Sequence, residues 1–172
     1  MDRLGEPRQQ LAKEDDPEFI RSQSILKDFR IIFRSVQDHS RSVEKKTGIS
    51  AAQLWMLWEL FNEPGLTVSA LARVLSIHQS TCSNMLDKIQ KKGLVCRDRS
   101  LDDQRVVCLY LTDKGSTLLA KAPRPAQGAL FDVLLRLPDK VLSELESGLH
   151  QLIDALNNVD EKAAMLPITE EK

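Results

Sequence analysis

Residues 66–115 read LTVSALARVLSIHQSTCSNMLDKIQKKGLVCRDRSLDDQRVVCLYLTDKG, and this stretch specifies the architecture of the chain. Apolar residues at three- and four-residue spacing predict a short helix that Thr67 caps and a second helix from about His78 to Lys92. The link between them is only Ser76-Ile77. Gly93 fits the left-handed end of the second helix. Two helices joined by so short a link indicate a helix-turn-helix.

A β-hairpin is predicted directly after the two helices. Residues 94–99 and 105–111 read as strands, and the polar residues 100–103 read as the turn between them. A helix-turn-helix followed by a hairpin is a winged helix-turn-helix. The sequence therefore predicts a mainly α fold with a small β-hairpin wing.

The second helix has one polar face that suits the major groove of duplex DNA. Small hydrogen-bonding side chains near its start let the backbone approach base edges, and the lysines further along meet phosphates. An arginine on the hairpin can enter a narrow minor groove, and Asp103 can hold the guanidinium of Arg105. An amphipathic helix pair with a solvated polar face is the alternative, which the wing disfavours. The predicted DNA-contacting residues are Gln79, Ser80, Thr81, Asn84, Lys88, Lys91, Arg97, Arg99 and Arg105.

Several motifs resemble the MarR (multiple antibiotic resistance regulator) family. The pattern Asp103-x-Arg105-xxx-Leu109-x-Leu111-Thr112-xx-Gly115 resembles the wing signature of that family. Residues 80–83 and 87–95 resemble its second helix, and residues 48–60 resemble the helix before the motif. The resemblance covers about residues 19–159. It implies a homodimeric regulator that binds small aromatic or phenolic acids between the dimer helices and the winged unit.

The chain departs from the family pattern at four positions. His78 stands where the family usually has a serine helix cap, and Cys82 replaces a usual valine. Pro123 and Pro125 interrupt a helix that is often continuous in the family, because proline lacks the N–H and clashes with the preceding turn. The prolines bear on the geometry of the dimer.

Apolar stripes flank the winged region (residues 47–112) on both sides. Residues 17–46 and 113–160 are predicted to form dimerisation helices, the last with leucines spaced as in a coiled coil up to Val159. A small winged domain cannot cover both stripes, so we expect them to pair across a two-fold axis. Two second helices in such a dimer meet successive major grooves about 34 Å apart, which predicts a palindromic operator. Residues 1–16 and 161–172 read as flexible polar tails.

Two kinds of switch are compatible with the sequence. The resemblance implies a repressor released by a small ligand, and the candidate pocket residues are Phe33, His39, Arg41, Trp55 and Trp58. The alternative for Trp55 and Trp58 is packing in the core. The alternative for His39 and Arg41 is a position on a solvated helix face. Cys96 and Cys108 lie on the two predicted wing strands, where a turn centred near residues 101–102 places them nearly opposite, so a disulfide or a metal contact is a second hypothesis. Two incidental thiols are the alternative, and Cys82 reads as a small core residue.

Composition bounds the remaining classes of function. The 172 residues have a net charge of −1, but residues 88–105 carry six basic against three acidic side chains, a local excess that favours DNA. Aromatic residues make up only 5%, which disfavours stacking of single-stranded nucleic acid. Neither a membrane span nor a secretory signal is expected, and the three cysteines fit a cytoplasmic protein. No catalytic site, cofactor or metal site is predicted. A winged module for protein contacts without DNA is the remaining alternative.

Overall fold

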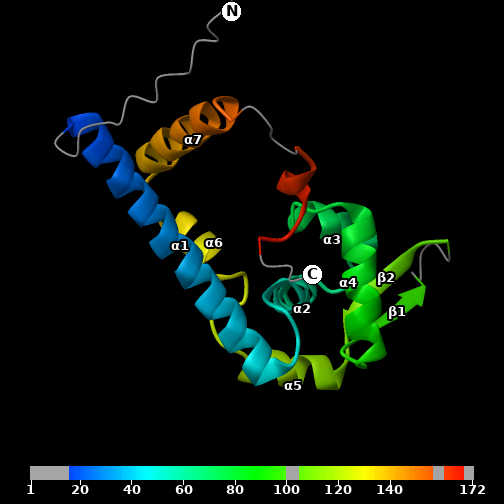
Figure 1. Cartoon of the computed structure of the whole chain (residues 1–172). Helices are drawn as coiled ribbons and strands as arrows, with labels where there is room; N and C mark the ends of the chain where they lie inside the picture. The colour runs from blue at the N-terminus through cyan, green and yellow to red at the C-terminus, as the bar shows by residue number, and fades with distance from the viewer. Residues whose placement is uncertain (1–15, 100–104, 157–160, 169–172) are drawn as a thin grey trace, which may run out of the picture. The chain divides into compact units, whose positions relative to one another are not determined.

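The computed structural model describes residues 16–99, 105–156 and 161–168. Its elements are helices α1 (Pro17–Thr47), α2 (Ala51–Asn62), α3 (Val68–Val74), α4 (Gln79–Lys91), strands β1 (Val95–Arg99) and β2 (Val107–Leu111), helices α5 (Asp113–Lys121), α6 (Ala129–Leu134) and α7 (Asp139–Asp154), and the 3₁₀ helix η1 (Glu161–Met165) (Figure 1). The predicted fold class, mainly α with a β-hairpin wing, is confirmed. The chain divides into two compact units after Arg34. None of the helices in the described ranges is long and apolar enough to cross a membrane.

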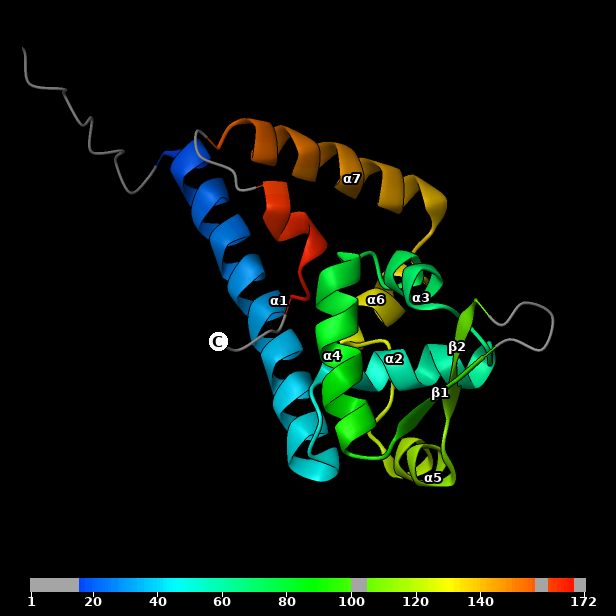
Figure 2. The same ribbon diagram turned by 90° about the vertical axis from the view of Figure 1, so that its right-hand side faces the viewer.

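Helix α2 forms the centre of the hydrophobic core. Its residues Leu54, Met56, Leu57 and Leu60 are buried, as its nearly continuous apolar sequence predicts. The helix begins with a reciprocal cap, in which the Gln53 N–H donates to Ser50 Oγ at 3.3 Å and the Ser50 N–H donates to Gln53 Oε1 at 3.1 Å. Figure 2 shows α2 crossing behind α4. The core therefore gives α4 a fixed surface on which to pack.

Helices α3 and α4 begin where the sequence predicted. Thr67 caps α3, because the Ala70 N–H donates to its Oγ1 at 3.2 Å. His78 is the N-cap of α4 with extended backbone, but its side chain makes no capping hydrogen bond. Cys82 on α4 is fully buried, which confirms the prediction of a core residue. The remaining buried residues of α4 are Met85, Leu86 and Ile89.

The wing is an antiparallel pair in which Val95 lies opposite Leu111 and Arg99 opposite Val107. Both strands are shorter than predicted. Leu94 lies in the turn that closes α4 instead, since its N–H donates to Ile89 O at 3.0 Å, and its carbonyl accepts from the Thr112 N–H at 3.1 Å. The predicted turn at residues 100–103, Asp103 included, lies outside the described residues.

The region from residue 113 onward consists of three separate helices, with the Pro123 and Pro125 segment between α5 and α6, as the predicted interruption of the helix at these prolines requires. The predicted C-terminal tail, residues 161–172, forms η1 at its start and is described as far as Ile168, and its Leu166 and Ile168 line a pocket with residues of the winged region. Helix α7 ends at Asp154, and Val159 lies outside the described residues.

Glycine at position 115 is required by the contact between α5 and the end of α4. A Cβ atom added there would lie 2.1 Å from the carbonyl oxygen of Leu94, which is fixed by its own hydrogen bond to Thr112. The backbone must shift to admit any side chain.

We predict that Gly115→Ala lowers the free energy of unfolding by about 1–3 kcal/mol or more, the cost typical of overpacking. Gly148→Ala is the matched control, because a Cβ at that position on α7 meets nothing within 4 Å. This control should raise stability by roughly 0.5–1 kcal/mol, since alanine favours helix. Urea denaturation of both variants measures the two effects, and equal stability of the two would contradict the prediction.

Candidate functional site

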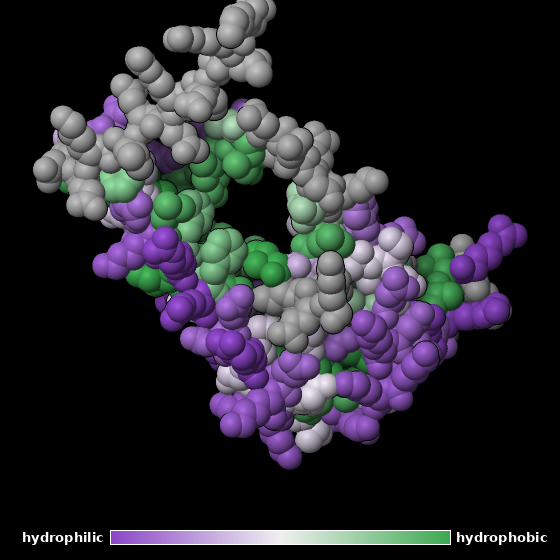
Figure 3. Space-filling model, in the orientation of Figure 1, coloured by the Kyte–Doolittle hydropathy of each residue, from purple (hydrophilic) through white to green (hydrophobic). Residues whose placement is uncertain are grey.

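Helix α4 presents its polar face to solvent and its apolar face to the core. Five of the predicted base- and phosphate-contacting residues on α4 are exposed, with a sixth, Thr81, half-buried. The exposed ones include Asn84 and Lys88, which lie one helical turn apart on the same face. In Figure 3 the region of α4 and α5 is mostly hydrophilic. The other exposed members of the set are Gln79, Ser80 and Lys91.

One wing arginine is directed toward α4 rather than away from it. Arg97 Nη2 donates to Asp87 Oδ1 at 2.7 Å, and both side chains are partly exposed. Surface ion pairs of this kind contribute about 0.2–1 kcal/mol, so the pair connects the hairpin to α4 only weakly. The contact of Arg97 with DNA stays a prediction. Arg99 and Arg105 are exposed at the outer end of the hairpin.

Backbone pairing connects the wing to the core. The Leu109 N–H donates to Leu66 O at 3.0 Å, and the Gly65 N–H donates to Leu109 O at 2.9 Å. The loop before α3 thus extends the pairing of β2 on its other edge. Lys92 Nζ also donates to the Gly48 carbonyl, which connects the end of α4 to the start of α2. These contacts hold α4 and the hairpin in one arrangement.

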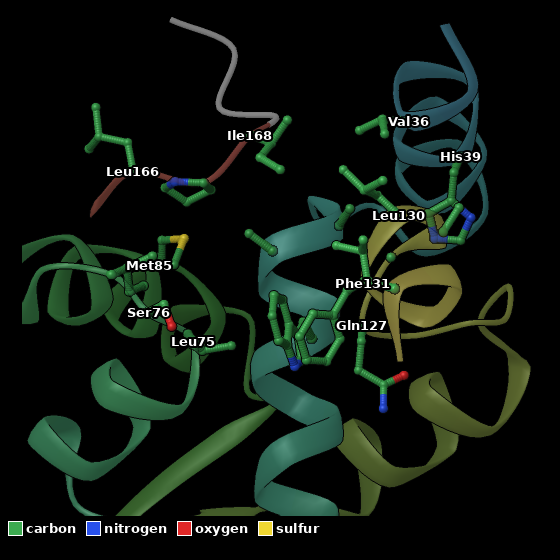
Figure 4. A pocket seen from close by; sticks show the side chains of 18 of the residues that line it. Val36, His39, Leu75, Ser76, Met85, Gln127, Leu130, Phe131, Leu166 and Ile168 are labelled. Atoms are coloured by element: carbon green, nitrogen blue, oxygen red, sulfur yellow. The ribbon is translucent and has the colours of Figure 1, made fainter. Parts of the chain in front are cut away.

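Behind α4 lies an apolar cavity of roughly 300 Å³ within the second compact unit. Two of the predicted pocket residues, His39 and Trp55, line it. Trp55 packs against Phe131, with ring centroids 4.8 Å apart. His39 Nε2 is buried and has no hydrogen-bond partner among the described residues. Figure 4 shows His39 beside Leu130 at one side of the cavity.

The other three predicted pocket residues do not line this cavity. Phe33 lies in the first compact unit and is 56% exposed. Arg41 faces a separate polar hollow and pairs with Asp38. Trp58 stacks on Phe61 and lies under the guanidinium of Arg124, 4.4 Å from the ring centroid. Spacing along a helix could not separate these environments, because it does not say which neighbouring helix covers each face.

The sequence did not predict most of the residues that line the apolar cavity. The missed residues come from the α3–α4 link, from the buried face of α4, from α6 and from the C-terminal segment. The short apolar run Met165-Leu166-Pro167-Ile168 inside a polar tail was the available signal. The principal missed residues are Leu75, Ile77, Met85, Leu130, Phe131, Leu166 and Ile168.

Cys96 and Cys108 do not lie nearly opposite each other, which the hypothesis of a disulfide between them requires. Cys96 lies opposite Tyr110, and Cys108 lies opposite Asp98, so the two cysteines are diagonal neighbours. Diagonal neighbours lie about 7 Å apart, whereas a disulfide needs Cβ atoms about 4 Å apart. Cys96 is exposed and Cys108 is buried. No group of three or more potential metal ligands occurs in the part of the chain that the structure describes.

Comparison with known proteins identifies the family. The sequence profile of the MarR family matches residues 49–107. The organic hydroperoxide resistance transcriptional regulator of Bacillus subtilis (strain 168) is 30% identical over 112 residues, which cover 65% of this chain and 75% of that protein. This chain belongs to the MarR family.

Other similarities are more limited in extent. A putative transcriptional regulatory protein for the hcr operon of Thauera aromatica is 31% identical over 100 residues, 58% of this chain and 60% of that protein. The MarR-family chain described here spans about six tenths of the length of several relatives that it matches. The crystal structure of Streptococcus pneumoniae FabT in complex with DNA has a TM-score of 0.54 and 22% identity, covering 77% of this chain and 95% of that one. This similarity shows a shared fold.

We predict that only one of the three thiols reacts rapidly with Ellman's reagent in the native protein. Burial raises the pKa of Cys82 to about 11 from its usual 9.0, so the thiolate is scarce, and Cys108 is sterically covered. The fast thiol should disappear in Cys96→Ser and remain in Cys108→Ser. Rapid reaction of Cys82 would contradict this assignment.

The free energy of unfolding should also fall as the pH rises above 9, because the Cys82 thiol loses its proton more readily in the unfolded chain than in the folded protein.

Proposed function

We propose that this protein is a transcriptional regulator that binds double-stranded DNA through α4 and the wing. The observation that carries the proposal is that α4 has two different faces. Its small polar residues and lysines are exposed, and its opposite face is buried in the core. A helix held in this way can enter a major groove without uncovering the core. The names of two relatives, a regulator of the hcr operon and a hydroperoxide resistance regulator, support the same class.

Different residues serve affinity and sequence selectivity. Lys88 and Lys91 are placed to meet phosphates, which makes binding sensitive to salt. Ser80, Thr81 and Asn84, with Gln79, are the base-reading candidates, since short hydroxyl and amide groups donate and accept at base edges. Arg99 and Arg105 extend the contact from the outer end of the wing.

The same proposal includes a homodimer on a palindromic operator. Leu145, Leu149 and Leu152 of α7 are each about 40% exposed, although apolar residues at this spacing ordinarily pack on another helix. Figure 3 shows hydrophobic residues along the edge of α7. The first compact unit also has an exposed apolar stripe on α1, with Ile25 and Ile32 among its residues. A second copy of the chain would cover both stripes.

The proposed regulation is release of a repressor by a small aromatic or phenolic acid in the apolar cavity. A volume of roughly 300 Å³ suits a ligand with one ring. The walls are apolar, and the aromatic rings of Trp55 and Phe131 suit contact with another ring. The lining also has polar side chains, among which His39, whose Nε2 has no hydrogen-bond partner among the described residues, is the proposed group to orient a carboxylate or phenol.

We predict that Arg105→Ala weakens binding to the regulator's own upstream intergenic DNA by about 1–3 kcal/mol without lowering the melting temperature. Fluorescence anisotropy over a salt series measures the effect. The control is Lys140→Ala, which removes the same charge from an exposed position on α7.

Loss of binding in both variants would mean that net charge alone matters. No preference of the unmodified protein for this DNA over random duplex would sink the DNA-binding proposal. The reading as a protein-contact module would then replace it.

A fourth prediction concerns the cavity. Salicylate, as a probe, should bind with heat release in titration calorimetry, and His39→Phe should weaken binding about tenfold, since it removes a hydrogen bond to a charged group while keeping a ring. Arg41→Ala is the control because Arg41 lines the other hollow. Unchanged affinity in His39→Phe would contradict the role of His39.

A further inference from the structure

The C-terminal segment reaches the start of the proposed reading helix. The backbone N–H of His78 donates to the carbonyl oxygen of Met165 at 3.2 Å. His78 is the N-cap of α4, and its own side chain makes no capping hydrogen bond. The η1 segment therefore supplies a hydrogen bond at the helix entrance from a position 87 residues later in the chain, 165 minus 78.

Side chains of the same segment face the apolar cavity. Ala164, Leu166 and Ile168 form part of its wall, opposite residues of α6. In Figure 4, Leu166 and Ile168 lie on one side, with Met85 and Leu75 below them and Leu130 across the cavity. Leu166 is 46% exposed and Ile168 is 69% exposed, so the contact is shallow. A shallow apolar contact with one backbone hydrogen bond is strong enough to form and weak enough to be displaced.

The point of attachment is conformationally constrained. Ser76, in the link between α3 and α4, has a φ of +53°, a left-handed value that residues other than glycine seldom adopt. Such a conformation persists where surrounding contacts hold it. The Ile77 N–H donates to Ala72 O at 3.0 Å on one side of the link, and the His78 bond to Met165 secures the other side.

We propose that residues 163–168 form an intrachain brace that docks on the α3–α4 link and holds the first turn of α4 in place. Docking of the brace does not depend on the proposed function. The effect of the brace on DNA affinity does, because it rests on the proposed binding of DNA through α4. The first turn carries Gln79, Ser80 and Thr81, so loosening of the brace makes the proposed reading residues less ordered before binding. Ordering them on DNA then costs conformational entropy, and affinity falls.

The brace also connects the cavity to α4. A molecule in the cavity shares the wall formed by Leu166 and Ile168, and these shallowly held side chains give way more readily than the helices opposite them. Displacing them pulls on the carbonyl of Met165 and weakens its bond to His78. A molecule bound in the cavity therefore favours the state in which the brace is released and the first turn of α4 is less firmly held.

The test uses the full-length chain with the double substitution Leu166→Asp and Ile168→Asp. Charged groups at these positions disfavour contact with the apolar wall, and their exposure leaves the fold intact, which circular dichroism verifies. Ala163→Asp is the matched control, because it adds a charge to the same segment at a residue outside the cavity wall. The readout is hydrogen exchange of the His78 amide, followed by NMR.

We expect exchange of the His78 amide to be at least about tenfold faster in the double variant and unchanged in Ala163→Asp, because the bond to Met165 opens more often. Equal exchange in the double variant and the unmodified protein would overturn docking of the brace. Equal acceleration in Ala163→Asp would overturn it as well, since the cavity wall would then be irrelevant.

A second measurement separates the brace from DNA recognition. Affinity for the upstream DNA should fall roughly threefold to tenfold in the double variant, in line with ordering a few side chains. Faster exchange with unchanged DNA affinity would overturn the holding of the reading helix by the brace. If the unmodified protein binds no DNA, the proposed function fails, and the exchange experiment alone still decides whether the segment docks.

Discussion

Burial of one face of α4 is the interaction on which the rest of the structure depends. Cys82, Met85, Leu86 and Ile89 lie against the core, and burial of a Met, Leu or Ile side chain contributes about 1.5–3 kcal/mol. The same packing orients Asn84 and Lys88 outward, because residues on a helix cannot turn independently. Stability of the domain and presentation of its polar surface therefore have one physical origin. This coupling explains why a short stretch of sequence could predict both.

Around α4, backbone hydrogen bonds set the positions that side-chain packing leaves free. Leu66 pairs with Leu109, and Leu94 accepts from Thr112, so the hairpin is attached at its base on both sides. Gly115 allows α5 to approach this attachment closely. At the other end of α4, the hydrogen bond from the His78 N–H to the Met165 carbonyl is likewise a backbone contact between segments that are distant in the chain. A helix held at both ends and along one face has few ways to move, which makes each of the holding contacts a point of control.

Sequence reasoning succeeded for contacts that are close in the chain and failed for those that are distant. Alternation located both wing strands, yet the pairing of Cys96 with Tyr110 depends on the length of the intervening turn, which alternation does not specify. Helical spacing selected His39 and Trp55 but equally selected Trp58, whose partner is Arg124 from beyond α5. The sequence of the brace predicts a tail, because a few apolar residues among charged ones give no periodic pattern.

The helix caps, the glycine turns and the period of the apolar residues specify the order of elements and the exposed face of α4, because these signals act over a few residues. They were sufficient for the winged helix-turn-helix and for the family. The direction of Arg97 toward Asp87, the makeup of the apolar cavity and the docking of Met165 at His78 arose only from folding. Each joins segments that are separated along the chain, and such contacts depend on the packing of whole helices, which no local pattern encodes.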